Sequence, residues 1–192
     1  MTKKRCPWLN LKNPQYVEYH DREWGRPVHD DHKHFEMITL EGAQAGLSWE
    51  TVLKKRERYR EVFKNFDPVK VSKFSSAKVE KLMLDPGIIR NRLKIESTIT
   101  NAKAFIKIQK EFGTFDKYIW NLVGAKTINS FETLEDYPTK TPTSDKISKD
   151  LKKRGFRFVG STIIYAYMQA CGMVQDHSKD CYLGGKKLRN LS

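Results

Sequence analysis

Apolar residues recur at intervals of three and four along most of the chain, which is the spacing of one face of a helix. This periodicity predicts helices after Ser48, at 68–71, after Ser76, across 89–106, at 115–122, after Ser144 and at 163–171. Residues 124–144 are rich in Thr, Ser and Pro and predict a loop, and residues 155–160 fit a short strand or an extended segment. We therefore expect an all-α fold in which residues 1–192 form a single domain.

Composition adds a core and a strong positive charge to this picture. Hydrophobic residues make up 39% of the 192 residues and the net charge is +13. The excess is concentrated, because residues 51–110 hold 16 basic and 6 acidic residues, whereas residues 1–50 hold 7 and 8. Such a surface attracts polyanions, nucleic acid first. No apolar run reaches the roughly 18–20 residues of a membrane span, and no apolar signal segment follows the charged start, so we expect a cytoplasmic protein without a membrane partner.

Potential metal ligands stand near the two ends of the chain. Cys6 and His20 lie near the N-terminus, and His177 and Cys181 have a spacing that allows both to face the same way. Two Cys and two His form the usual closed, tetrahedral structural zinc site. The alternative is that these residues are unrelated, since the two halves are far apart in sequence. Three Cys is an odd number, which argues against a disulfide framework.

Other histidines and the third cysteine have plainer explanations. We expect His29, His32 and His34 to lie on a solvated helix face, and Cys171 to fill the core of an apolar helix.

The segment between two of the predicted helices has the features of a phosphate-binding hairpin. Asp85-Pro86-Gly87 predicts a tight turn, and glycine permits a close backbone approach. The following helix would begin with free N–H groups, which favour an anion, with Lys94 adding charge. The sequence thus predicts a helix-hairpin-helix element at about 76–105 that contacts DNA phosphates without reading sequence, through Gly87, Ile88, Ile89, Arg90 and Arg92. The alternative is an ordinary helix connection with a basic surface.

An acidic residue stands among aromatic residues in the nearly neutral N-terminal part. Glu41 lies in a stretch of small and apolar residues just before Trp49, and Tyr16, Tyr19 and Trp24 precede it. Aromatic rings can stack on an extruded base, and a carboxylate can accept a hydrogen bond from its exocyclic amine. The alternative is that the aromatics belong to the core and Glu41 is solvated.

Several of these segments occur together in one known family. The matching segments, in chain order, are Arg5-Cys6-Pro7-Trp8, Tyr19-His20-Asp21, Glu23-Trp24-Gly25, Leu40-Glu41-Gly42, Ala45-Gly46-Leu47-Ser48-Trp49, Leu53-Lys54-Lys55-Arg56, Phe66-Asp67-Pro68, Gly87-Ile88-Ile89-Arg90, Leu151-Lys152-Lys153, Gly155-Phe156 and His177-x3-Cys181. Each segment is weak alone, but their order over residues 6–181 is specific. The chain resembles the bacterial DNA-3-methyladenine glycosylase I family of the helix-hairpin-helix DNA glycosylase superfamily.

The resemblance implies a function and roles for the candidate residues. It implies that Glu41 hydrogen-bonds the damaged adenine, that Trp49 stacks on it and that Tyr16 and Tyr19 line the pocket. Trp24 and Trp8 match family positions and are expected in the pocket or its wall. It also implies one structural Zn²⁺ per chain, joining the N- and C-terminal regions through 6–20 and 177–181, with the ligands Cys6, His20, His177 and Cys181.

The resemblance also implies which chemistry is absent. Residues 100–112 contain no Asp, although the superfamily usually supplies a catalytic aspartate beyond the hairpin, and we expect Asp116 to be structural. Asn91 stands where the lyase branch carries a lysine, which implies simple hydrolysis that leaves an abasic site. The expected partner is double-stranded DNA containing alkylated adenine, bound by a monomer.

Three other interpretations remain open at the level of sequence. A zinc-stapled DNA-binding module would explain the charge and the hairpin but not Glu41 among aromatics. A glycosylase with a different or broader base preference would share every feature. A small-molecule hydrolase with an incidental basic surface would bind without the steep salt dependence of phosphate contacts.

Overall fold

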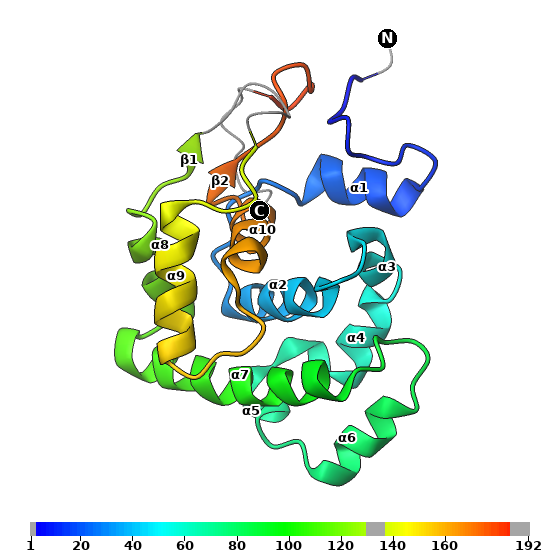
Figure 1. The fold of residues 1–192 in the computed structure, drawn as a ribbon, viewed down its shortest axis with the longest axis vertical. Coiled ribbons are helices and arrows are strands. Elements are labelled where there is room, and N and C mark those ends of the chain that lie inside the picture. Colours follow the sequence, from blue (N-terminus) through cyan, green and yellow to red (C-terminus); the bar gives the residue numbers. More distant parts are fainter. Residues whose placement is uncertain (1–2, 130–136, 185–192) are drawn as a thin grey trace.

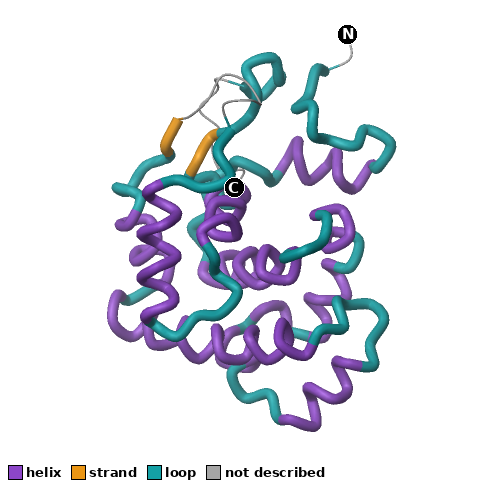
Figure 2. Tube along the Cα trace, in the orientation of Figure 1, coloured by secondary structure: helices purple, strands orange, loops and turns teal. Residues whose placement is uncertain are grey.

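A computed structural model describes residues 3–129 and 137–184 of the chain. Most of these residues are helical, as the sequence predicts, and two short strands form a parallel pair that joins Ile128 to Val174 (Figures 1 and 2). None of the described helices is both long and apolar enough to cross a membrane. The elements are α1 (Pro14–Arg22), α2 (Asp31–Gln44), α3 (Trp49–Leu53), α4 (Arg56–Val62), the 3-10 turn η1 (Lys64–Phe66), α5 (Pro68–Val71), α6 (Ser76–Met83), α7 (Arg92–Phe112), α8 (Phe115–Leu122), β1 (Ile128–Asn129), α9 (Pro142–Lys153), α10 (Ser161–Ala170) and β2 (Val174–Gln175).

The centre of the fold is α2, against which α3, η1, α7, α8 and α10 pack (Figure 1). Every residue of this helix from His34 to Ala43 is buried. A helix that is covered on all sides needs no polar face. The sequence of α2 therefore lacks the alternation of apolar and polar positions by which an amphipathic helix is recognised. The same position dehydrates any charged residue that α2 carries near its end.

The hairpin between α6 and α7 is fastened to α4. Asp85 accepts hydrogen bonds from the Arg58 guanidinium and from the backbone N–H of Gly87, each at 2.8 Å. A Cβ at Gly87 would lie 2.4 Å from Arg58 Cγ, so only glycine allows this approach. The sequence predicts that the backbone at Gly87 is closely approached. In this structure the group that approaches it is the Arg58 side chain.

The two ends of the described chain meet beside α1. The backbone N–H of Tyr182 donates to the Lys4 carbonyl at 2.8 Å, and Lys4 forms an ion pair with Asp180 at 2.6 Å. Arg5 also pairs with Asp21 at the end of α1, at 2.7 Å. These contacts bring residues near 6 and near 181 together, although about 175 residues separate them.

Some helix boundaries differ from the expectation. Ser75 and Thr141 are the N-caps of α6 and α9, because each accepts a hydrogen bond from the backbone N–H three residues ahead. These helices therefore begin at Ser76 and Pro142, earlier than the sequence predicts. The periodic stretch after Ser48 is two helices, α3 and α4, with a break at 54–55. Residues 155–160 form a turn and an irregular segment without a strand, so of the two alternatives for this segment the strand is not found. Part of the predicted loop at 124–144, residues 130–136, lies outside the described residues.

Candidate functional site

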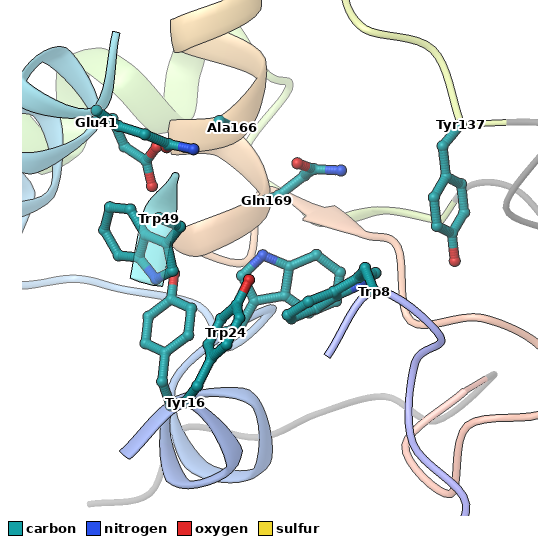
Figure 3. Close-up of a pocket in the computed structure, with 10 residues that line it drawn as sticks. Trp8, Tyr16, Trp24, Glu41, Trp49, Tyr137, Ala166 and Gln169 are labelled. Atoms are coloured by element: carbon teal, nitrogen blue, oxygen red, sulfur yellow. The ribbon is translucent and has the colours of Figure 1, made fainter. Parts of the chain in front are cut away.

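A cavity of about 220 Å³ opens between α1, α2, α3 and α10 (Figure 3). A cavity of about 150 Å³ is enough to hold benzene, so this one has room for a larger planar ring system. It contains all six residues that the sequence nominates for base binding or catalysis, together with four others. Its lining residues are Trp8, Tyr16, Tyr19, Trp24, Glu41, Gln44, Trp49, Tyr137, Ala166 and Gln169.

Glu41 is the only acidic residue among the described residues that line this cavity. Its side chain comes from the last turn of the central helix and is 4% exposed. None of the described residues hydrogen-bonds its carboxyl group. Burial raises the pKa of Glu41 to about 8, and the charge of Arg56 opposes the rise. The alternative in which Glu41 is solvated is thus wrong, and the group is a buried carboxyl that lines the cavity.

Trp49 and Tyr19 form the buried part of the aromatic wall. Ser48 caps the start of α3 and accepts a hydrogen bond from the backbone of Thr51, which fixes the position of Trp49 as the first residue of that helix. The Trp49 and Tyr19 rings lie 5.3 Å apart between centroids. Within the described chain, the buried Trp49 indole N–H has no hydrogen-bond partner. Because buried indole N–H groups usually have one, this donor is available to a ligand.

Trp8, Tyr16 and Trp24 extend the wall toward the chain ends (Figure 3). The Trp8 ring lies 4.9 Å from that of Trp24 and 5.5 Å from that of Tyr16, in edge-on and tilted arrangements. Such contacts between ring edges and faces fix the rings against one another. The wall therefore presents preformed aromatic surfaces on more than one side of the cavity.

Four lining residues are missing from the sequence prediction: Gln44, Tyr137, Ala166 and Gln169. Gln44 follows Glu41 by one helical turn, so the spacing rule for a shared helix face could have found it. Gln169 and Ala166 come from α10, far away in sequence, and carry no local signal. The Gln169 side-chain amide donates to Asp176 at 2.6 Å, which holds it in place.

A short turn with an exposed leucine connects the two helices that carry Glu41 and Trp49. Gly46 has φ +77 there, a conformation that favours glycine. Lys94 of α7 donates to the carbonyls of Ala43 and Ala45, at 2.8 and 2.6 Å, and so holds the end of α2. This fixed turn carries Leu47, which is 42% exposed, between the helices that bear Glu41 and Trp49. Lys94 was expected to add charge to the hairpin, and its ammonium is instead engaged here.

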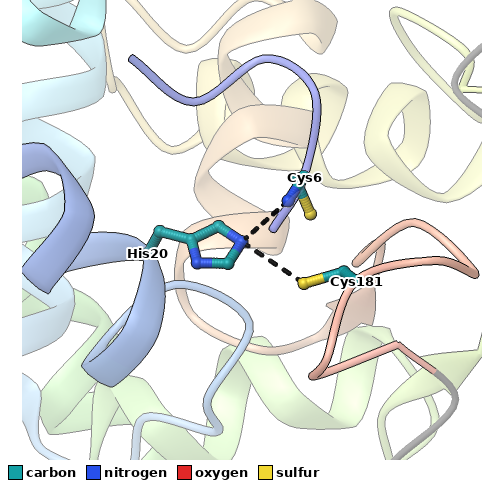
Figure 4. Close-up of side chains that lie close together, drawn as sticks. All are labelled: Cys6, His20 and Cys181. Atoms are coloured by element: carbon teal, nitrogen blue, oxygen red, sulfur yellow. Dashed lines mark hydrogen bonds between the residues drawn. The ribbon is translucent and has the colours of Figure 1, made fainter. Parts of the chain in front are cut away.

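Cys6, His20 and Cys181 form a buried cluster (Figure 4), and the His20 ring lies 5.4 Å from that of Trp8 in the aromatic wall. Their potential ligand atoms all lie within 4.8 Å of one another, and Cys181 Sγ is 3.6 Å from His20 Nε2. Ligand atoms on one tetrahedral zinc lie about 3.3–3.8 Å apart, given bond lengths of about 2.0–2.3 Å. Burial raises the pKa of the Cys6 thiol to about 12, so only a bound cation would make a thiolate favourable here.

His177 is adjacent to this cluster but is not one of its three members. Its ring lies 5.0 Å from that of His20, and its Nε2 is buried without a partner in the described chain. Its Nδ1 contacts the Gln175 side-chain oxygen at 2.5 Å, and His20 Nδ1 contacts Asp21 at 2.8 Å. Acceptors at both Nδ1 atoms place the protons there and leave Nε2 as the potential ligand, as in known zinc sites.

The hairpin occupies its predicted position, but its backbone donors are largely engaged. The N–H groups of Gly87 and Ile88 donate to Asp85, and that of Ile89 donates to the Tyr59 hydroxyl at 3.2 Å. Ile88 is also a buried core residue. In this conformation these three backbone N–H groups are therefore engaged within the chain, and contact of the three residues with DNA phosphates stays a prediction.

The side chains around the hairpin differ in availability. Arg92 is engaged by Glu80 in two 2.7 Å bonds, and Asn91 caps α7 by accepting from the Lys94 backbone. Arg90 is exposed, and among the described residues its side chain and backbone N–H have no hydrogen-bond partner. Lys55 of the α3–α4 connection donates to the Pro86 carbonyl at 2.6 Å. It therefore brings a positive charge to the hairpin that the sequence alone does not predict.

The remaining histidines are mostly structural. His34 is fully buried between the Tyr167 hydroxyl, at 2.7 Å, and Asp116, at 3.1 Å, so its expected place on a solvated face is wrong. His29 is exposed and contacts the same carboxylate at 3.0 Å. Asp116 thus joins α8 to α2 and does not line the cavity, and Cys171 is fully buried in the core, as the sequence predicts.

A mostly helical fold with a buried carboxyl in a preformed aromatic cavity is typical of proteins that accept a planar base. The chain belongs to the methyladenine glycosylase family, whose model matches residues 8–184. It is 50% identical to DNA-3-methyladenine glycosylase 1 of Escherichia coli (strain K12) over 186 residues, which cover 95% of this chain and 99% of that protein.

Solved structures agree with this assignment. A crystal structure of 3-methyladenine DNA glycosylase I superimposes with a TM-score of 0.91 at 48% identity, over 93% of this chain and 98% of that chain. A variant of 3-methyladenine DNA glycosylase I in complex with 3-methyladenine superimposes with a TM-score of 0.89 at 37% identity, over 92% of this chain and 95% of that one. The mostly helical fold and the family that the sequence resembles are thereby confirmed.

Proposed function

We propose that this protein is a monofunctional DNA-3-methyladenine glycosylase, which extrudes 3-methyladenine from alkylated double-stranded DNA and hydrolyses its glycosidic bond. The observation that carries the proposal is the buried Glu41 carboxyl in an aromatic cavity of base size. The name of the E. coli relative and the complex of a related structure with 3-methyladenine support the substrate. The product is an abasic site, which enters base excision repair.

The substrate explains why little catalytic apparatus is needed. Methylation at N3 makes the adenine cationic, which weakens the glycosidic bond and makes the base a good leaving group. A lesion that pairs or stacks poorly also lowers the cost of extrusion, which is a few kcal/mol. The Trp49 and Tyr19 rings supply faces that attract a cation by about 0.5–2 kcal/mol. No aspartate lines the described cavity, so we assign no general base of that kind.

Glu41 has two tasks in this proposal. Its carboxylate accepts a hydrogen bond from the exocyclic amine of the base, and its charge offsets the positive charge that develops at the sugar. The ionised form accepts the stronger hydrogen bond and alone can offset the charge, and burial disfavours this form until a cation arrives. The group therefore acts as a charge partner that responds to the lesion.

DNA approaches, in our proposal, over the turn at Leu47 and the helix-hairpin-helix element. The exposed leucine stands between Glu41 and Trp49 in the chain, where an apolar wedge could hold the gap that the extruded nucleotide leaves. Arg90 offers a free guanidinium and a free backbone N–H to a phosphate. The hairpin residues Gly87 and Ile88 shape the turn, and Arg92 contributes charge while paired with Glu80.

We further propose one structural zinc held by Cys6, His20, His177 and Cys181. The close trio and the orphaned Nε2 of His177 support this set, because two thiols and two imidazoles complete a tetrahedron. Bound there, the ion would join the N-terminal segment, α1 and the C-terminal segment. It takes no part in the reaction.

The proposed function is tested by incubating the protein with methylated duplex DNA and separating the released bases by chromatography. We expect 3-methyladenine in the supernatant and an intact strand at each abasic site. Glu41→Gln is the matched variant, since it keeps size and shape but cannot ionise. Absence of 3-methyladenine release would favour a DNA-binding module, and release of other bases in preference would favour a broader glycosylase.

Two further expectations belong to this proposal. A single-domain enzyme that acts on one nucleotide needs no second copy, so we propose a monomer, which sedimentation equilibrium tests. A repair enzyme acts where the chromosome lies, so we propose a cytoplasmic location. All three cysteines are free in the described structure, which fits a reducing compartment.

A further inference from the structure

Arg56 is a buried arginine whose guanidinium donates three hydrogen bonds to carboxylates. The proposed reaction assigns it no role. It is the first residue of α4, and its side chain is 3% exposed. Its Nε donates to Glu36 at 2.8 Å, and its two terminal nitrogens donate to the two oxygens of Glu23 at 3.0 and 2.8 Å. A buried guanidinium with this many charge-assisted bonds is geometrically fixed.

The two partners of Arg56 belong to two of the four helices around the cavity, α1 at its C-cap and α2. Glu23 caps the end of α1, four residues beyond Tyr19, and Glu36 lies in α2, five residues before Glu41. The start of α1 is tied separately, because the Asn13 amide donates to Glu50 of α3 at 2.8 Å. The end of α1 is thus held to α2 through Arg56.

Lys33 makes a parallel but weaker connection. Its ammonium contacts Glu23 at 2.9 Å and Glu36 at 3.1 Å, and its side chain is partly exposed. A partly exposed ion pair between lysine and glutamate does little to fix the relative positions of two helices, since solvent screens it and the three ammonium donors rotate freely. Arg56 differs in being buried and in gripping Glu23 with two parallel bonds.

We propose that Arg56 is a positioning residue of the base cavity, which sets the separation between the aromatic wall on α1 and the carboxyl group on α2. The proposal rests on the proposed function, since it assumes that a methylated base sits between Tyr19 and Glu41. Reacting and binding groups displaced by about 1 Å can lose a hundredfold in rate. Replacing the guanidinium therefore weakens base binding even though Arg56 itself does not line the cavity.

The test compares four variants with the wild type by calorimetry with free 3-methyladenine and by excision from methylated duplex DNA. Arg56→Met removes the charge and the fork, and Arg56→Lys keeps the charge but not the two parallel bonds. Lys33→Met removes the weaker connection within the same network. Arg154→Met is the matched control, because Arg154 also bridges two carboxylates, Glu111 and Asp150, away from the cavity.

We expect Arg56→Met to bind 3-methyladenine at least tenfold more weakly, Arg56→Lys to recover part of the loss, and Lys33→Met to change the affinity less than threefold. Arg154→Met should bind the base as the wild type does, whatever it loses in thermal stability. Affinity for undamaged duplex DNA should stay within twofold in all four, since no phosphate contact is altered. Should Arg56→Met not fold, Arg56→Lys alone decides, by a threefold or greater loss of base affinity.

Wild-type affinity for the base in both Arg56 variants overturns the positioning role, and so does an equal loss in Arg154→Met. These outcomes leave wild-type excision of 3-methyladenine intact, so the proposed function survives them. A wild-type protein that neither binds nor releases 3-methyladenine overturns both proposals together.

Discussion

Excision of 3-methyladenine should rise with pH through the neutral range, because Glu41 must ionise to meet a cationic base. With a pKa of about 8 in the free protein, the carboxyl is ionised to about 1% at pH 6, about 9% at pH 7 and half at pH 8. A unit charge at about 4 Å in a medium of effective dielectric constant near 20 contributes about 4 kcal/mol. That lowers the pKa by about three units when the base is bound, so the complex is ionised at neutral pH.

The profile of kcat/KM reports the free enzyme, so it should follow the ionisation of empty Glu41. Between pH 6 and pH 8 we expect kcat/KM to rise about fiftyfold and then to level off. The sign follows from the direction of the shift, since burial raises this pKa and the active form is the one that appears above it. Maximal kcat, which reports the complex, should stay flat over the same range.

The assay measures release of 3-methyladenine from methylated duplex DNA at subsaturating protein, from pH 6 to pH 9, with spontaneous release subtracted. Glu41→Gln serves as the control, since an amide cannot ionise and its residual rate should not depend on pH. A wild-type kcat/KM that stays flat from pH 6 to pH 8 would refute the reasoning. The same holds if Glu41→Gln keeps the wild-type slope.

Three further changes have definite expected outcomes. Glu41→Gln should raise the free energy of unfolding by about 3 kcal/mol at pH 7. Above about pH 4.5 the carboxyl ionises in the unfolded chain but not in the folded one, which favours unfolding of the wild type. Urea denaturation should show that the difference between the two proteins disappears near pH 4. Arg90→Ala should reduce by about one the slope of log affinity for duplex DNA against log salt concentration, with free 3-methyladenine binding unchanged, and an unaltered slope would remove Arg90 from the phosphate contacts. Cys181→Ser should lower bound zinc from one per chain to none, by elemental analysis of the purified protein, and should lower the melting temperature; a wild-type zinc content would contradict the ligand assignment.

The sequence predicts the aromatic lining of the cavity well, because each predicted aromatic residue lies close to another in the chain or on the same face of a helix. Tyr16 and Tyr19 are one turn apart on α1, and Glu41 precedes Trp49 across a single tight turn. What pattern alone does not supply is the contribution of α10, because Gln169 reaches the cavity only through tertiary packing. The family resemblance gave roles to the first group and none to Gln169.

The hairpin shows the opposite limit of prediction. The Pro86-Gly87 turn and the flanking helices are local features, and all three form as predicted, although the second helix spans Arg92–Phe112 rather than 89–106. Which backbone N–H groups remain free is not local, since Asp85 turns back onto its own hairpin and Tyr59 arrives from α4. His34 is a similar case, because its partners come from α8 and α10.

Burial of Glu41 offers a route to discrimination that needs no contact with the added methyl group. At pH 7 the empty cavity holds a mostly neutral carboxyl, and ionising it costs about one pKa unit, or about 1.4 kcal/mol. A cationic methylated base offsets that cost with about 4 kcal/mol of attraction, while undamaged adenine, being neutral, does not. The difference adds to the lower extrusion cost of a lesion that stacks poorly. A cavity whose only ionisable acidic group among the described residues is one buried carboxyl thus selects for the positive charge that methylation creates, and the same charge makes the base easy to release.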